Sequence, residues 1–252
     1  SQKKYPHQWS WDSSFHAIVN CHLGRVDLAK DEIYTLLGNM LPDGRLHHII
    51  FHERSMAYIP LSRFMRHWPQ TNCYPLVQPP VVALAVNEVW QKYEDINFLR
   101  DTIPLLEKHF NWLENERLFG SSSLVSIYSP WESGLDHKPS FDRLLGRLAR
   151  LPMGTYFALY LCEGRMARHC FKPEEIMKRG YFNVREVLFN TIYALGLKAI
   201  GTMFSAMGEQ SKAENFSKRA DSVEEAILNQ CYDSATGLYF DIDVNTGKLI
   251  RE

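Results

Sequence analysis

The sequence predicts an all-α fold in which helical hairpins form a toroid of inner and outer helices. Three observations lead to this prediction. Some helical stretches carry a single apolar stripe and others are apolar nearly all round, and the two kinds alternate along the chain. Long loops rich in aromatic residues separate the resulting pairs. A helix that is apolar on all sides must be buried, whereas a helix with one stripe covers a surface. An inner and an outer layer are therefore expected.

The outer helices are predicted from apolar residues that recur at helical spacing in the ranges 29–40, 99–113 and 213–227. In the first range, Ala29, Ile33, Leu36 and Met40 follow one another at steps of 4, 3 and 4 residues. This spacing places one apolar stripe on a helix that is otherwise charged.

The inner helices are predicted at 11–23, at 79–86, from 152–161 onward and at 187–204, because these stretches lack a polar face. Pro79 and Pro80 open the second of them. Proline is tolerated in the first turn of a helix because no backbone donor is needed there. These four stretches are expected in the interior.

Buried and amphipathic stretches pair into the units 11–41, 79–117 and 186–231, each with a short polar link. Repeated hairpins close into a toroid or stack into a solenoid. The long connections 42–78, 118–151 and 232–252 favour the toroid, in which they gather at one rim and shape a pocket. A short strand is expected at 237–243. Roughly four hairpins are too few for a closed ring, so residues 1–252 are expected to form a partial toroid domain that lacks its C-terminal hairpins.

Composition excludes several classes of function. The formal net charge is −1 and there is no basic stripe, so neither a nucleic-acid nor a membrane partner is expected. No apolar run approaches the ~18 residues of a membrane span, and the polar start of the chain does not resemble a signal peptide. Five scattered cysteines without a CxxC motif indicate reduced thiols. We therefore expect a soluble protein of the cytoplasm.

The most informative motif is WESGLD at 131–136, which lies in a stretch without helical or strand periodicity. A carboxylic acid beside an aromatic ring is the arrangement that sugar hydrolysis uses, because the ring packs on a pyranose and the acid protonates the leaving oxygen. Trp131, Glu132 and Asp136 are the candidates here. The alternative is a solvated acidic loop with one structural tryptophan, which we consider the weaker interpretation.

Two further motifs add candidates for sugar binding. The run QWSWD at 8–12 opens the first hairpin, and its Trp9 and Trp11 are suited to stacking on a sugar. Asp12 is suited to binding sugar hydroxyls, although Asp12 or Ser13 capping the helix is an alternative. Gln78 precedes a buried helix, where lining a cavity and capping are equally compatible with the sequence.

The run DGRLHHIIFH at 43–52 begins with a turn signal and continues as extended chain. His48 and His52 have the spacing of a metal pair on a helix, but the segment does not look helical and no third ligand is suitably spaced. We therefore predict no metal site, and expect His48 to form hydrogen bonds to a substrate or to the loop.

These motifs, in this order, resemble glycoside hydrolase family 63, most of all its mannosylglycerate and glucosylglycerate hydrolase branch. Trehalases and processing α-glucosidases are more distant relatives. The resemblance implies an (α/α)6 toroid, inversion at an α-glycosidic bond, a small carbohydrate substrate and no cofactor. It also implies that Asp136 is the general acid, and that Asp12, His48 and Gln78 line the sugar pocket.

The chain departs from the family pattern in two places. The residues after the acid are usually Asn-Ser-Pro, whereas here they are His137-Lys138-Pro139. The family's general base lies in the C-terminal third of the toroid, and Glu252, the last residue here, matches no base motif. An inverting hydrolase needs both carboxylates. We therefore expect the 252 residues alone to be inactive and to self-associate through an exposed apolar face. A catalytically dead sugar-binding remnant and a helical-repeat scaffold remain alternatives.

Overall fold

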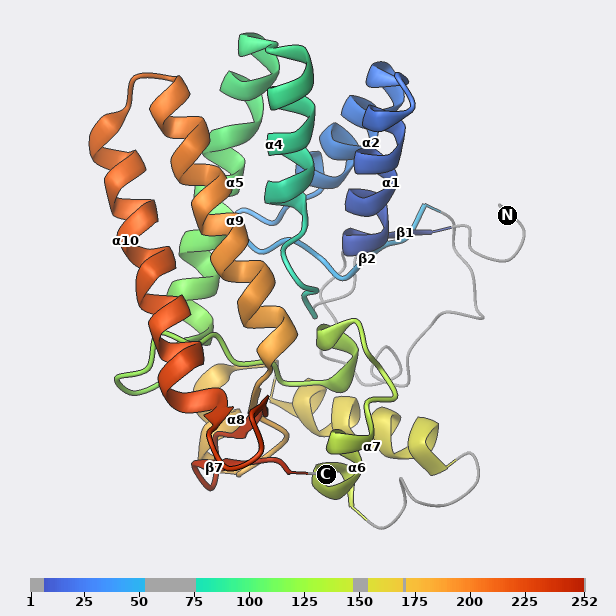
Figure 1. The fold of residues 1–252 in the computed structure, drawn as a ribbon. Helices are drawn as coiled ribbons and strands as arrows, with labels where there is room; N and C mark the ends of the chain where they lie inside the picture. Colours follow the sequence, from blue (N-terminus) through green and yellow to red (C-terminus); the bar gives the residue numbers. More distant parts are fainter. Residues whose placement is uncertain (1–6, 53–75, 147–153, 170, 252) are drawn as a thin grey trace.

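The computed structural model describes residues 7–52, 76–146, 154–169 and 171–251. Long helices run side by side through most of the molecule, and the short turns within each hairpin lie at the upper end of the view (Figure 1). These helices are α1 (Ser10–His22), α2 (Val26–Gly38), α4 (Val82–Tyr93), α5 (Ile96–Arg117), α9 (Val187–Ala206) and α10 (Gln210–Ala226).

The pairing of these helices follows the predicted hairpins. Helix α1 packs on α2, α4 packs on α5, and α9 packs on α10. Helix α4 also contacts α1 and α9, so the inner helices are neighbours within one layer. The hairpins predicted at 11–41, 79–117 and 186–231 are therefore confirmed.

The fourth predicted inner helix differs from expectation. Helices α6 (Asp142–Leu145), α7 (Gly154–Arg168) and α8 (Pro173–Lys178) lie at the lower end of the molecule, where α7 crosses the direction of the long helices (Figure 1). Only one face of α7 meets the core in the described residues, and Tyr156 and Phe157 are 52% and 57% exposed. The interpretation of 152–161 as buried on all sides is therefore wrong, because the helix lies at the end of the layer instead of within it.

Short antiparallel strands connect the loops. Strand β1 (Gln8–Trp9) pairs with β2 (Ile49–Ile50), and so joins the start of α1 to the 43–52 segment. Strands β3 (Val184–Arg185), β6 (Ile242–Asp243) and β7 (Lys248–Leu249) form a second sheet. Strands β4 (Tyr232–Asp233) and β5 (Leu238–Tyr239) form a third. The strand predicted at 237–243 is thus present as β5 and β6.

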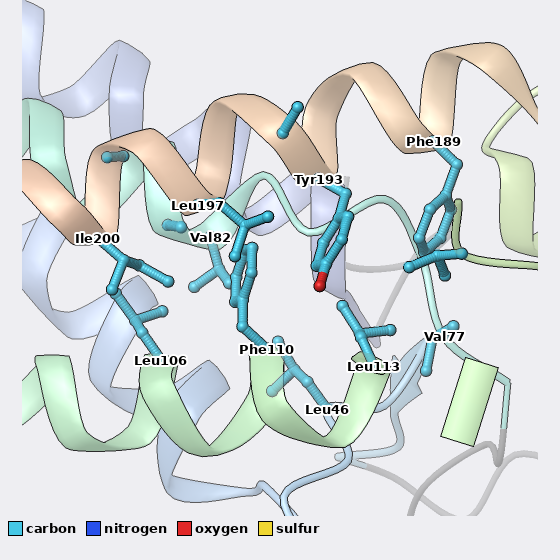
Figure 2. Close-up of a cluster of buried hydrophobic side chains, with 14 of the residues drawn as sticks. Leu46, Val77, Val82, Leu106, Phe110, Leu113, Phe189, Tyr193, Leu197 and Ile200 are labelled. Carbon is cyan, nitrogen blue, oxygen red and sulfur yellow. The ribbon is translucent and has the colours of Figure 1, made fainter. Parts of the chain in front are cut away.

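The core between α5 and α9 shows how the layers are packed (Figure 2). The rings of Phe110 and Tyr193 stack with their centroids 5.5 Å apart. A Cβ at Gly196 would lie 2.5 Å from the Phe110 ring, so the small residue at this position permits the close approach of the two helices. Around this pair lie Leu46, Val82, Leu106, Leu113, Phe189, Leu197 and Ile200.

Helix α9 is long and apolar enough, by length and composition, to cross a membrane, with a mean hydropathy of 1.4. However, 67% of this stretch is buried inside the protein, against α4, α5 and α10. Such burial is typical of the central helix of a packed core.

Candidate functional site

Several predicted site residues meet where α1 begins. The backbone N–H of Trp11 donates to Oε1 of Gln78 at 3.0 Å. The indole ring of Trp11 lies directly against Gly134. Asp136 is close enough to Asp12 for the two carboxyl charges to interact. Three segments that are remote in sequence therefore form one site at the loop end of the helices.

Gln78 caps a helix, but not the helix that it precedes. Its side chain is buried, and its amide oxygen accepts from the second residue of α1, which has no side-chain cap of its own. The alternative in which Asp12 or Ser13 caps this helix is wrong, because α1 already begins at Ser10 and its N-cap residue is Trp9. Asp12 lies in the first turn, where a carboxylate interacts favourably with free backbone N–H groups. Gln78 thus organises the start of α1, and Asp12 lies in its first turn.

The loop that carries Asp136 is held by its own serines. The hydroxyl of Ser129 accepts from the backbone N–H of Trp131 at 3.3 Å. The hydroxyl of Ser133 donates to the carbonyl of Pro130 at 2.7 Å and accepts from the N–H of Leu135 at 2.9 Å. These bonds fold 129–135 into a short 3₁₀ turn, η2 (Pro130–Ser133), immediately before the acid.

Gly134 meets two requirements that only glycine satisfies at low cost. Its φ is +74°, in the left-handed region, and a Cβ would overlap the ring of Trp11. We expect Gly134→Ala to lower the free energy of unfolding by about 1–2 kcal/mol, because alanine is strained in this backbone conformation. The displaced ring of Trp11 should lower it further. Thermal unfolding followed by tryptophan fluorescence measures both effects. Gly208→Ala is the matched control, since Gly208 has a φ of +78° but open space around it. Equal losses in the two variants would contradict the steric role.

The two carboxylates at the site face water but are partly surrounded by protein. Asp12 and Asp136 are both solvent-exposed residues. Loss of surrounding water raises the pKa of Asp136, Asp12 raises it further, and the neighbouring His137 opposes the change. Burial likewise raises the pKa of Asp12. Raised pKa values favour the protonated carboxyl, which is the form that donates a proton.

Glu132 is buried and its carboxylate is fully occupied. Arg117 donates to both oxygens, at 2.7 and 2.8 Å, and the backbone N–H groups of Val77 and Tyr128 donate to one oxygen each, at 3.0 and 2.7 Å. The side chain has no exposed surface. We therefore reassign Glu132 from a substrate contact to a role in holding the loop, because no oxygen is left to face a sugar.

Helix α7 adds two aromatic residues that the sequence analysis missed. The ring of Tyr160 meets that of Trp131 edge-on, with the ring centroids 5.6 Å apart. The ring centroids of Tyr156 and His137 are 4.8 Å apart. Their spacing of four residues places both tyrosines on one face of a helix. This spacing is the signal that would have identified them, since a face of two tyrosines is suited to a surface that binds a ligand.

Trp9 and His48 lie beside the start of α1. Trp9 is half-buried in β1, where it pairs with Ile49. The carbonyl of His48 accepts from the N–H of Ser10 at 3.0 Å, and its own N–H donates to the carbonyl of Leu76 at 2.8 Å. Burial lowers the pKa of His48 to about 4, so its imidazole is neutral at pH 7. The contacts of Trp9 and His48 with a substrate stay predictions.

Within the described residues, no group of three or more His, Cys, Asp or Glu side chains has the arrangement of a metal site. A cavity of about 410 Å³ is lined among others by Arg45, Lys108, Trp112 and Arg117. It contains none of the predicted site residues. The candidate site at the start of α1 is therefore separate from the residues that line this cavity.

Comparisons with known proteins connect almost the whole chain to one family. Residues 5–252 match the family model of the mannosylglycerate hydrolase MGH1-like glycoside hydrolase domain. The mannosylglycerate hydrolase of Rubrobacter radiotolerans is 28% identical, with 98% of this chain and 62% of the relative covered. The glucosylglycerate hydrolase of Mycolicibacterium hassiacum is 29% identical, with 98% and 63% covered.

A similar structure belongs to the same family. The crystal structure of the GH63 mannosylglycerate hydrolase from Thermus thermophilus in complex with Tris and D-glycerate has a TM-score of 0.83 and 29% identity. The match covers 98% of this chain and 64% of that chain. The chain therefore spans less than two thirds of the length of these relatives.

Proposed function

The chain belongs to the mannosylglycerate hydrolase MGH1-like group of glycoside hydrolase family 63, and from this premise we propose an inverting α-glycoside hydrolase. Its proposed substrate is a small glycoside such as glucosylglycerate or mannosylglycerate. Relatives with both specificities are about equally similar in sequence, which supports this pair of substrates without separating them. The substrate is proposed to bind at the loop end of α1, with Asp136 as the general acid.

The observation that carries the proposal is the setting of Asp136. Its carboxyl is open to solvent, has a raised pKa, and follows a loop that is fixed against the ring of Trp11. We propose that Asp136 protonates the glycosidic oxygen while Trp11 covers the apolar face of the sugar and Asp12 accepts from its hydroxyls. Trp131 and Tyr160 are proposed to flank the leaving group.

The proposal is tested by calorimetric titration with mannosylglycerate, glucosylglycerate and trehalose. Saturable binding of either glycerate glycoside, lost in Asp12→Ala and retained in Asp27→Ala on the outer helix α2, supports the site. Binding of trehalose alone would favour a trehalase-like specificity. Absence of binding to all three would contradict a carbohydrate site and favour the helical-repeat scaffold.

Residues 1–252 by themselves are expected not to hydrolyse these glycosides. The base and its water must lie about 6.5–9.5 Å across from the acid, and the resemblance assigns the base to a region of the relatives that this chain does not cover. The measurement is product formation by the isolated polypeptide against the protein at its natural length. Turnover by the isolated polypeptide would contradict the assignment of the base.

The same polypeptide is expected to self-associate. Phe15 and Val19 on α1 and Leu23 just after it recur every four residues and are 44%, 55% and 63% exposed. An apolar patch of this kind is unfavourable on a monomer. Sedimentation velocity should show a concentration-dependent dimer or larger species that Val19→Lys weakens. Leu28→Lys, at an equally exposed position on α2, is the control. Monomeric behaviour at all concentrations would contradict this expectation.

We also propose a reducing compartment such as the cytoplasm. The described cysteines Cys21, Cys162 and Cys231 are free and buried, which is the usual state of structural thiols in such a compartment.

A further inference from the structure

Lys138 closes the turn that presents Asp136. Its backbone N–H donates to the carbonyl of Leu135 at 3.0 Å, which makes Asp136 and His137 the two central residues of a tight turn. The position of Lys138 therefore sets the direction in which the Asp136 side chain leaves the loop. The start of the same turn is fixed by Gly134 against Trp11, as described above.

The side chain of Lys138 joins this turn to two carboxylates from other parts of the chain. Its Nζ lies 2.7 Å from Oε1 of Glu186 and 2.6 Å from Oδ2 of Asp241. The side chains of Glu186 and Asp241 are 0% and 2% exposed, and that of Lys138 is 25% exposed. An ammonium group between two buried carboxylates replaces part of the water that both have lost.

Both carboxylates accept hydrogen bonds from the N-terminus of α9, the central helix of the core. Oε2 of Glu186 accepts from the N–H of Phe189, and Oδ1 of Asp241 accepts from the N–H of Val187 at 3.0 Å. The other groups around them are the hydroxyl of Ser140, which donates to Asp241, and the thiol of Cys231 with Arg185 nearby. Among the described residues, Lys138 is the cation that ion-pairs with both acids.

This arrangement links the acid loop to the start of α9, a largely buried helix. We propose that Lys138 is a positioning residue for Asp136, holding the turn 135–138 on the N-terminus of α9 through Glu186 and Asp241. The inference rests on the proposed function for its catalytic meaning, since Lys138 itself contacts no reacting group. It also gives a physical reason for the lysine in the His-Lys-Pro run, which departs from the usual pattern after the acid.

The test is the titration of the Asp136 carboxyl, followed by ¹³C NMR in the 252-residue chain. In the unaltered protein the pKa of Asp136 is expected above its ordinary value, chiefly because the carboxyl has lost surrounding water, with His137 lowering it and Asp12 raising it. Lys138→Met releases the turn into water, which should lower the pKa toward the ordinary value of about 3.9, although the lost ammonium charge acts in the opposite direction. Lys138→Arg, whose guanidinium donates to two carboxylates at once, should keep it raised.

Two further variants separate positioning from a general loss of structure. Lys138→Met combined with Asp241→Asn removes one buried charge and keeps an acceptor for Val187, so the fold is retained and the pKa of Asp136 should still fall. Lys212→Met is the matched control, because Lys212 also bridges two carboxylates, Glu107 and Glu209, at 2.9 and 3.3 Å on the exposed outer face. It should leave the titration of Asp136 unchanged.

An unchanged pKa of Asp136 in the double variant would overturn the inference. A fall in this pKa that is as large in Lys138→Arg as in Lys138→Met would also overturn it. In the protein at natural length, kcat should fall by up to about 10²-fold in the double variant with little change in KM. A KM effect alone would also overturn it. If no glycoside is bound or hydrolysed, the proposed function fails, while the titration still decides whether Lys138 positions the turn.

Discussion

Replacing Asp136 by Asn is expected to lower the hydrolysis of an unactivated α-glycoside by at least about 10²-fold in the protein at its natural length. Asn has nearly the shape of Asp but no proton to donate to the leaving oxygen. The variant's hydrolysis of a substrate whose leaving group departs without protonation, such as a glycosyl fluoride, should fall much less. The difference between the two substrates separates loss of the acid from loss of binding.

The pH dependence of hydrolysis is a second, independent test of the role of Asp136. The pKa of Asp136 is raised by its loss of solvent and by Asp12. A general acid works only when protonated, so activity should decline as the pH rises through this raised pKa, and that decline should be absent in Asp136→Asn. Asp142→Asn, at the first residue of α6 and six residues after Asp136, is the control. Near-normal turnover of the unactivated substrate by Asp136→Asn would contradict the assignment.

The hairpins could be predicted from the sequence because their signals are local. Apolar periodicity over ten or more residues distinguishes a buried helix from a surface helix without knowledge of its neighbours. Helix α7 shows the limit of this argument. The stretch is apolar nearly all round, but it crosses the end of the layer and leaves Tyr156 and Phe157 in water. Its position depends on where the preceding loop directs the chain, which periodicity does not encode.

The candidate site could be predicted only as a set of positions. Short motifs identified Trp11, Asp12, Gln78 and Asp136, and the structure brings them together at the start of α1. The role of Glu132 was beyond the sequence, because its partners come from three separate segments. A carboxylate beside Trp and Gly has the same sequence pattern whether it faces a sugar or an arginine.

Breaking the ion pair between Arg117 and Glu132 is expected to cost about 3–5 kcal/mol of the free energy of unfolding, because either single change leaves an uncompensated charge in the interior. The side chains are 5% and 0% exposed, and the guanidinium also lies 4.0 Å from the centroid of the Tyr128 ring. Arg117→Met leaves the carboxylate with only two backbone donors. Glu132→Gln leaves the guanidinium without its counter-charge. Urea unfolding of both variants measures the loss.

The exposed pair between Lys212 and Glu107 provides the comparison, since pairs of this kind contribute about 0–1 kcal/mol. A double-mutant cycle over Arg117 and Glu132 should give a coupling well above that of the exposed pair. The combined variant should not regain full stability, because the N–H groups of Val77 and Tyr128 would still lack the carboxylate that they share. These two N–H groups lie in the segments that carry Gln78 and Trp131, so the variants should also weaken sugar binding without altering Asp12 or Asp136. A loss of stability no larger than that of Lys212→Met would contradict the view that this buried pair holds the loop in place.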